Sequence, residues 1–486
     1  MEINVRDKKW DEDFFLRERK EVLSIWPTGK EVDIDEAIEY QKGLSERRSF
    51  VKVVEKLHRE GRTVVFPRAG TPILEDEIEL NRTLVEAGLC LIPVTPDSYC
   101  RGAQFERAQK GLEESIRLGR PMLNGYPTAI HGVKNTRKMT EANEAAYNQR
   151  LTNIGGVRLM AEIAFASGMT AALADPFLTL ANYEKNATPE QCIRCYQYIH
   201  RLVGYYAERG VILTVDFDGP HPCGVFPFGV DLASIIVAAL MAAEQGVKSL
   251  MPRSLLNGNM AQDIAWARVL RRLVREYLDK FGYEDVLTPG LFLDPFPLYP
   301  YPQDMGWAFG FTGYLAVVAA LAEAEATAPR TIDEAAGIPT KEAHAITHRA
   351  AKWIFDIVRA QKIHYEDEEM KTEEKMTELE IRAIIDKLLE LGDGDLAVGY
   401  VRGVEAGVID TPFCPNVNIK DKALGVRDSK GALRYLNFGN IPVPKEVKEF
   451  HREKVAEREK AEGRKMDYKV AIEDLWSLSK GKLIGG

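Results

Sequence analysis

Three arginines stand at or just beyond segments that we expect to form buried strands. Arg68 follows the apolar run Val64–Phe66 in the segment VVFPRAG, Arg101 lies in TPDSYCRG, and Arg150 lies in YNQRLTNIGG. A guanidinium can bind a carboxylate through two parallel hydrogen bonds, so three converging arginines would neutralise a small dianionic substrate. The spacing of the three leaves separate surface ion pairs as an equally good interpretation.

Expected strands and helices alternate between residues 61 and 362, and this alternation determines where the arginines must lie. About eight such units predict an α/β fold, a (β/α)8 TIM barrel, with an open doubly wound sheet as the alternative. In both folds ligands bind at the carboxyl ends of the strands. The third expected strand places Arg150 in a long loop that follows it. The expected strands lie near residues 63–67, 89–94, 121–126, 169–174, 211–216, 247–252, 287–292 and 326–332.

Two extensions flank the expected barrel of residues 61–362. Residues 1–60 are polar and predict an N-terminal helical lead-in, in which Asp33 or Asp35 caps a helix. Residues 363–486 predict a C-terminal α/β appendage. It begins with a charged amphipathic helix, continues with small β elements that include a turn at residues 429–431, and ends in a solvated helix rich in opposite charges.

The composition excludes several classes of protein. The 486 residues carry a net charge of -9 without a basic stripe, which argues against nucleic-acid binding. Six scattered cysteines and a charged amino terminus that does not resemble a signal peptide favour the cytoplasm. The uncharged stretch Met305–Ala322 is about long enough to cross a bilayer. It is rich in Gly and Ala and lacks basic flanks, so we expect a buried barrel helix and no membrane association.

Other motifs in the chain are weak when taken singly. Cys192 and Cys195 form a CxxC inside an expected helix without a second cysteine pair, which makes zinc binding or redox chemistry improbable, and we expect no metal site in this chain. His131 and His221 lie beside glycines and prolines and are expected to be structural. The chain contains no P-loop, no dinucleotide fingerprint and no Asp-x-His-x-x-Gly segment of the kind that supplies a cobalt-ligating histidine.

Short segments from about residue 26 to the end of the chain resemble, in order, the large (epsilon) subunit of glutamate mutase, also called methylaspartate mutase. Because they span nearly the whole chain, the resemblance is specific. The segments are WPTGKEVD, FPRAG, MLNGYP, RLVGYYAERGV, AAEQGVK, GNMAQDIA, PQDMGWAFG, AAGIPTKEA, ELGDGDLAVG, FGNIP and GKLIGG.

The resemblance implies a TIM barrel that rearranges L-glutamate to threo-3-methyl-L-aspartate by radical chemistry with adenosylcobalamin. It also implies a separate small cobalamin-binding subunit and a homodimer of this chain within a heterotetramer. In the family, arginines at the positions of Arg68, Arg101 and Arg150 clamp the substrate carboxylates, and a tyrosine that matches Tyr183 contacts the substrate. The family's cofactor-contacting positions correspond to Gly70, Asn124, Asn182, Tyr301, Arg330, Glu334 and Ile338.

Three substrate-pocket positions depart from the family pattern. Leu173 stands where the family has a glutamate that receives the substrate's ammonium group, and Leu151 and Thr179 replace a histidine and a tyrosine. Asp175 is a candidate to supply the missing carboxylate. If nothing does, the substrate is a dicarboxylate without the amino group, such as glutarate rearranging to methylsuccinate. A catalytically silent barrel that serves as a scaffold is a further alternative.

Overall fold

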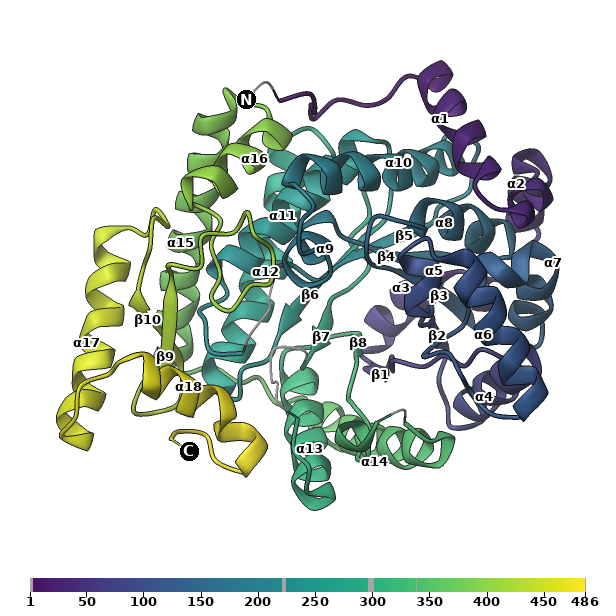
Figure 1. Cartoon of the computed structure of the whole chain (residues 1–486). Helices are drawn as coiled ribbons and strands as arrows, with labels where there is room; N and C mark the ends of the chain where they lie inside the picture. The colour runs from purple at the N-terminus through teal and green to yellow at the C-terminus, as the bar shows by residue number, and fades with distance from the viewer. Residues whose placement is uncertain (1–2, 221–223, 296–300, 338, 486) are drawn as a thin grey trace.

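The barrel is the centre of the structure. We describe residues 3–220, 224–295, 301–337 and 339–485 from a computed structural model of the chain. In this part of the chain eight short strands form one parallel sheet in the order β1-β8-β7-β6-β5-β4-β3-β2, which curves into a nearly closed barrel surrounded by helices (Figure 1). The predicted (β/α)8 barrel is therefore confirmed. The strands are β1 (Val64–Val65), β2 (Leu91–Val94), β3 (Ala146–Leu151), β4 (Ala171–Ala174), β5 (Thr214–Phe217), β6 (Leu250–Leu255), β7 (Phe292–Asp294) and β8 (Ala326–Thr327).

The seam between β1 and β2 closes just beyond the ends of these strands. The Thr95 amide donates a hydrogen bond to the Ala69 carbonyl at 2.8 Å. A Cβ on the neighbouring Gly70 would lie 2.4 Å from the Thr95 carbonyl oxygen. Only glycine therefore allows the two segments to approach at this point.

Helices cover the outside of the barrel, and several begin at a side chain that caps them. Thr188 and Gln191 form a reciprocal capping box at the start of α10, and Asn259 and Thr340 cap α12 and α14. Such caps satisfy backbone N–H groups that have no partner within the helix. The surrounding helices are α4 (Leu74–Glu86), α5 (Ser98–Arg101), α6 (Phe105–Leu118), α7 (Thr128–Glu141), α8 (Val157–Ala166), α9 (Pro176–Asn182), α10 (Pro189–Ala207), α11 (Gly229–Glu244), α12 (Met260–Lys280), α13 (Met305–Leu321) and α14 (Lys341–Ala360).

The N-terminal lead-in is helical, with α1 (Glu12–Ser24), α2 (Ile34–Lys42) and α3 (Phe50–Glu60). Asp33 caps α2, as predicted. Helix α3 covers the amino-terminal end of the barrel, where the Phe50 ring lies 6.1 Å from the rings of Phe66 and Phe292. These aromatic rings fill the lower half of the barrel.

The third strand was predicted at the wrong place. Residues 121–126 form a loop, of which Tyr126 makes an isolated bridge to Pro96, and β3 is Ala146–Leu151 instead. Arg150 therefore lies on a strand and not in a loop after one. The error has a physical cause: β3 directs Asn148 and Arg150 into the barrel, so it lacks the apolar run by which a buried strand is predicted.

The C-terminal appendage packs against α11 and α12 (Figure 1). The predicted turn at residues 429–431 joins a hairpin, but residues 396–410 (LAVGYVRGVEAGVID), which the sequence predicts as a small β element, contain helix α16. Gly399 explains the error, because a Cβ there would lie 2.1 Å from the Leu388 carbonyl oxygen of the neighbouring helix, so glycine serves close helix packing. The elements are α15 (Glu368–Gly392), α16 (Leu396–Ala406), β9 (Leu424–Arg427), β10 (Leu433–Asn437), α17 (Lys445–Glu462) and α18 (Tyr468–Ser477).

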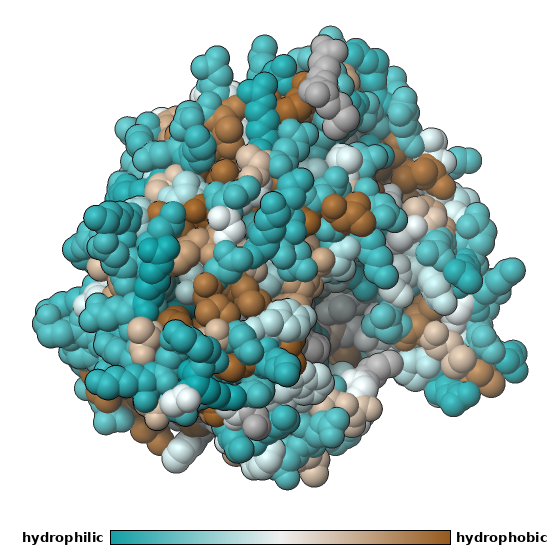
Figure 2. Space-filling model, turned by 60° about the vertical axis from the view of Figure 1, so that its left-hand side comes forward, coloured by the Kyte–Doolittle hydropathy of each residue, from teal (hydrophilic) through white to brown (hydrophobic). Residues whose placement is uncertain are grey.

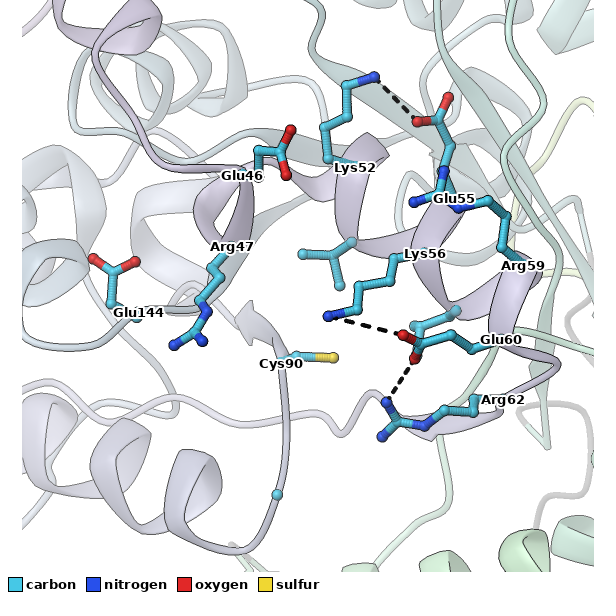
Figure 3. Close-up of a pocket in the computed structure, with 13 residues that line it drawn as sticks. Glu46, Arg47, Lys52, Glu55, Lys56, Arg59, Glu60, Arg62, Cys90 and Glu144 are labelled. Carbon is cyan, nitrogen blue, oxygen red and sulfur yellow. Dashed lines mark hydrogen bonds and ion pairs between the residues drawn. The ribbon is translucent and has the colours of Figure 1, made fainter.

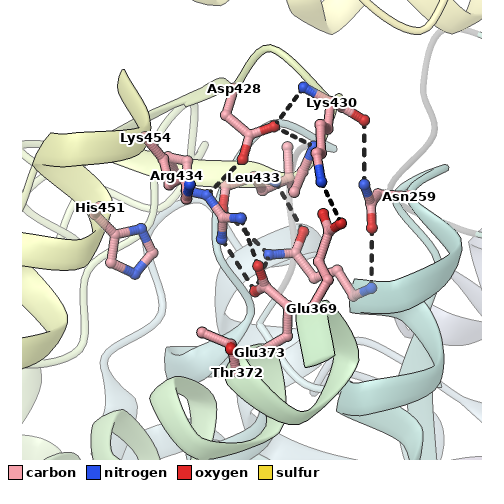
Figure 4. Close-up of polar contacts among 12 residues, drawn as sticks. Asn259, Glu369, Thr372, Glu373, Asp428, Lys430, Leu433, Arg434, His451 and Lys454 are labelled. Atoms are coloured by element: carbon pink, nitrogen blue, oxygen red, sulfur yellow. Dashed lines mark hydrogen bonds and ion pairs between the residues drawn. The ribbon is translucent and has the colours of Figure 1, made fainter. Parts of the chain in front are cut away.

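A buried ion pair holds the hairpin on the barrel (Figure 4). Arg434 on β10 donates to both carboxylate oxygens of Glu373 on α15 and, at 2.8 Å, to Asp428. Glu373 also accepts a hydrogen bond from Gln262 of barrel helix α12 at 3.0 Å. One carboxylate therefore joins the hairpin, α15 and the barrel.

The surface offers no sign of a membrane-spanning segment. In the described ranges, no helix combines the length and the apolar character that crossing a bilayer requires, α13 included. The face in Figure 2 is hydrophilic over most of its area, and hydrophobic residues show only in separate patches.

We predict that Glu373→Gln destabilises the appendage by about 3 kcal/mol or more, because it leaves a buried guanidinium without its full counter-charge. The matched control is Glu369→Gln on the same helix, whose partner Lys430 is 67% exposed, and it should change stability by less than about 1 kcal/mol. Thermal unfolding and hydrogen exchange of residues 424–437 would measure both. Equal effects of the two substitutions would contradict this account.

Candidate active site at the mouth of the barrel

A cluster of buried charges crosses the upper half of the barrel. Arg253 on β6, with no exposed surface, donates to Asp216 through Nε and Nη2 and to Asp294 on β7 at 3.4 Å. Asn148 on β3 donates to the other oxygen of Asp216 at 2.8 Å. The Arg253 guanidinium also lies 4.3 Å from the centroid of the Phe292 ring. The cluster therefore rests directly on the aromatic lower half of the barrel.

Arg68 and Arg150 lie on the mouth side of this cluster. Arg68 donates to Asp294 at 3.0 Å. Burial alone would raise the pKa of Asp294, but Arg68 and Arg253 hold it well below its usual range. Burial and the nearby Arg68 and Arg253 lower the pKa of Arg150 to about 10. The structure thus brings Arg68 and Arg150 into mutual electrostatic contact.

Of these two arginines, Arg150 donates fewer hydrogen bonds within the described ranges. It is 5% exposed, and within the described ranges its guanidinium donates no hydrogen bond. Its nearest carboxylate is Asp218, with 3.7 Å between Nη2 and Oδ2. A buried guanidinium in this state is an anion-binding group.

Arg101 joins the site through Tyr183. The Arg101 guanidinium lies 5.5 Å from the centroid of the Tyr183 ring and donates to the Thr152 hydroxyl at 2.8 Å. Tyr183 is also close enough to Arg68 and Arg150 to influence the pKa of each. The phenol therefore lies among all three arginines.

The four remaining substrate-pocket residues present no free acceptor. Leu173 pairs with Arg150 on one side and with Asp216 on the other, and Leu151 is fully buried. The Thr179 hydroxyl is hydrogen-bonded to Tyr196. The carboxylate of Asp175 caps α9 and accepts four backbone N–H groups, from residues 177, 178, 218 and 219. Asp175 is thus fully occupied in holding the backbone.

A cavity of about 470 Å³ opens beside Arg68. Its lining includes Gly70, Asn124 and Glu334, three of the expected cofactor-contacting positions. Arg330 forms an ion pair with Glu334, and the Tyr301 hydroxyl donates to the Arg330 carbonyl at 3.4 Å, so these two residues adjoin the cavity. Ile338 and His221 lie outside the described residues.

Two buried polar side chains near the mouth lack partners within the described part of the chain. Asn182, the last residue of α9, has no hydrogen bond at either amide atom. His344, from α14, lines the cavity with an unpaired Nδ1. Burial lowers the pKa of His344 to about 4, so the ring is neutral at pH 7. Asn182 does not belong to the cavity lining.

Sequence analysis missed the aspartates and the arginine that organise this site: Asp216, Asp218, Arg253 and Asp294. A pattern that could have revealed them is present in each case. Every one is a charged residue within or next to an apolar segment that was expected to be a strand, in TVDFD, MPRS and LFLD. A charge in such a run must face either a partner or a ligand.

A second cavity, of about 560 Å³, lies at the opposite end of the barrel (Figure 3). Helix α3 and the residues that precede β1, β2 and β3 line it, so it belongs to the amino-terminal face, which in this fold serves stability. Lys52, Lys56 and Arg62 are paired with glutamates of the same rim. We therefore place the active site at the other face.

The remaining candidate residues lie in a helix or make contacts within the fold. Cys192 and Cys195 are free thiols inside α10, and no group of three or more potential metal ligands occurs in the residues described. The His131 ring stacks on Tyr126 at 4.5 Å and its Nε2 lies 2.8 Å from the Pro72 carbonyl oxygen. Its surroundings fix the conformation of a loop and leave it no role at the mouth.

Comparison with known proteins identifies the family. A profile of the family Methylaspartate mutase E chain (MutE) matches residues 44–486. Proteins named glutamate mutase epsilon subunit are 38% identical in Desulfitobacterium hafniense (strain Y51), with 99% of each chain covered, and 36% identical in Treponema denticola, with 99% of this chain and 98% of the relative covered. The counterpart in Haloarcula marismortui is 32% identical, with 99% of this chain and 96% of the relative covered. This chain therefore belongs to the methylaspartate mutase E chain family.

Proposed function

We propose that this chain is the large catalytic subunit of an adenosylcobalamin-dependent mutase that rearranges L-glutamate to threo-3-methyl-L-aspartate. The observation that carries the proposal is the buried Arg150 guanidinium, which donates no hydrogen bond within the described ranges. Its nearest carboxylate, that of Asp218, lies 3.7 Å away, beyond hydrogen-bond distance, so a ligand carboxylate is its natural complement. The names of the relatives support glutamate as that ligand.

The chain's own part in the reaction is to bind and orient the substrate. Arg150 and Arg68 lie deep in the mouth and Arg101 lies at its edge, so together they can hold both carboxylates of a five-carbon acid. Asp294 and Arg253 fix the direction of Arg68. The Tyr183 ring lies among the arginines and excludes water from the substrate.

The mouth also offers a place for the adenosyl part of the cofactor. The cavity beside Arg68 has room for a nucleoside, and Gly70 is part of its lining. We assign contacts there to Gly70, Asn124, Tyr301, Arg330 and Glu334, with the unpaired amide of Asn182 as a further donor and acceptor. When bound, adenosylcobalamin supplies the radical that starts the rearrangement.

Further parts of the proposal rest on the family. A small subunit carries the cobalt-ligating histidine, because the Asp-x-His-x-x-Gly segment is missing from this sequence. Two copies of this chain and two small subunits form a heterotetramer in the cytoplasm. The residues 1–60, 61–362 and 363–486 act as lead-in, catalytic barrel and appendage.

Leu173 favours a second candidate reaction. This apolar side chain is fully buried beside Arg150, where an ammonium group would need an acceptor. A dicarboxylate without an amino group, such as glutarate rearranging to methylsuccinate, would avoid that need. A non-catalytic scaffold is the least favoured alternative, because buried arginines without a ligand only destabilise the fold.

The assay that decides between these reactions incubates the complex of both subunits and adenosylcobalamin with L-glutamate or with glutarate. We expect 3-methylaspartate from L-glutamate, followed by NMR. Formation of methylsuccinate alone would establish the second reaction. If neither product forms, the non-catalytic scaffold is the remaining alternative.

Substitution of Arg68, Arg101 or Arg150 by lysine should lower kcat/KM about tenfold or more, because an ammonium group cannot form the paired hydrogen bonds of a guanidinium. The control is Arg117→Lys on α6, at a side chain that is 67% exposed. Steady-state kinetics of the complex would measure each variant. Unchanged kinetics in all three variants would refute the role of these arginines in binding the substrate carboxylates.

The isolated chain should bind cobalamin weakly, and the cofactor should strengthen association with the small subunit, because a ligand that contacts both chains links their binding. Gel filtration with absorbance detection would measure both effects. Cobalamin that co-elutes with this chain alone at a one-to-one ratio would contradict the assignment of cobalt binding to the partner.

A further inference from the structure

Asp218 is a buried carboxylate at the mouth of the barrel whose hydrogen-bonding capacity the described residues leave unused. It lies one residue beyond β5 and is 1% exposed, and neither of its oxygens accepts a hydrogen bond from any residue that the structure describes. Its backbone is nevertheless fixed, because its amide donates to Asp175 at 2.9 Å. The carboxylate is thus held in place with its hydrogen-bonding capacity free.

The neighbouring aspartates differ from it in this respect. Asp216 accepts from Arg253 and Asn148, Asp294 accepts from Arg68 and Arg253, and Asp175 accepts four backbone amides. Asp218 lies 3.7 Å from both Arg150 Nη2 and Arg253 Nε, which is too far for a hydrogen bond. Among these four carboxylates, Asp218 is the one with both oxygens free of hydrogen bonds in the described residues, whereas Asp294 has only Oδ1 free.

Asp218 and Arg150 together suit the head group of an α-amino acid. In such a molecule the carboxylate and the ammonium are attached to one carbon, so their binding groups must be neighbours. The separation of 3.7 Å between Arg150 Nη2 and Asp218 Oδ2 satisfies this condition. A carboxylate bound to Arg150 would therefore bring an ammonium on the adjacent carbon next to Asp218.

The charges of the site lead to the same conclusion. Four guanidiniums, those of Arg68, Arg101, Arg150 and Arg253, lie near four carboxylates, those of Asp175, Asp216, Asp218 and Asp294. In their usual states at pH 7 these charges balance. An amino dicarboxylate then adds one negative charge to the site, whereas a dicarboxylate without the amino group adds two.

We propose that Asp218 receives the ammonium group of the substrate and makes the pocket selective for a 2-amino dicarboxylate. The proposal rests on the proposed function for the identity of the carboxylate-binding arginines. It supplies the acceptor that Leu173, Leu151, Thr179 and Asp175 do not offer. Asp218 then acts beside the bound substrate as a specificity-determining residue.

The test measures binding without turnover. The full-length chain and its small subunit, without adenosylcobalamin, are titrated calorimetrically with L-glutamate and with glutarate. Wild type should bind L-glutamate more tightly. Asp218→Asn should weaken L-glutamate binding about 10- to 100-fold, as expected for the loss of a hydrogen-bonded charge, and should leave glutarate binding equal or stronger. The control Asp294→Asn should weaken both acids alike, because Asp294 holds Arg68.

Two results would overturn the proposal: wild type that binds glutarate as tightly as L-glutamate, or Asp218→Asn that changes both affinities by the same factor. The first is measured on wild type and remains decisive if the variant does not fold. A complex that shows the expected selectivity, yet forms no rearranged product once adenosylcobalamin is added, would support the role of Asp218 and refute the proposed function.

Discussion

The structure depends on one constraint: charged side chains buried in the middle of the barrel must form ion pairs and hydrogen bonds with one another. Arg253 meets this constraint for its neighbours, since it binds Asp216 and Asp294 and lies over the Phe292 ring. Below it, phenylalanine rings and aliphatic side chains fill the barrel as an ordinary core. Above it, the interior is polar and open to a ligand. Arg253 therefore marks the boundary between the apolar lower half of the barrel and the polar upper half, which contains the candidate site.

The appendage contributes to the site although it follows the barrel in sequence. Asn416 donates to the carbonyls of Glu184 and Ala187 at 2.6 and 3.0 Å, and Cys414 contacts the Ala181 carbonyl at 3.3 Å. These carbonyls belong to the segment that carries Tyr183. The loop that places the phenol among the arginines is thus fixed by residues more than 200 positions away, which gives the appendage a role beyond covering α11 and α12.

The sequence predicted the parts of the fold that packing determines. Seven strands and most helices followed from apolar runs, periodic helices and caps such as Asp33. β3 was missed because its interior residues bind polar partners, and α16 was missed because its glycines serve helix packing. Arg68 was found because it directly follows an apolar run and Arg101 because it follows the second strand, whereas Arg150 was placed in a loop because β3 was missed. Asp218 stands beside an apolar run as the other missed charges do, but only the structure shows that its carboxylate accepts no hydrogen bond from the described residues.

The lack of hydrogen bonds from the Arg150 guanidinium in the described residues has a consequence for the stability of the protein. A buried guanidinium without a hydrogen-bond acceptor in the described structure lowers the stability of the ligand-free fold. Any ligand that supplies the acceptor binds the folded state of the chain but not the unfolded state. Such a ligand therefore raises the folded fraction. A carboxylate ligand bound at Arg150 would therefore make the folded chain more resistant to proteolysis.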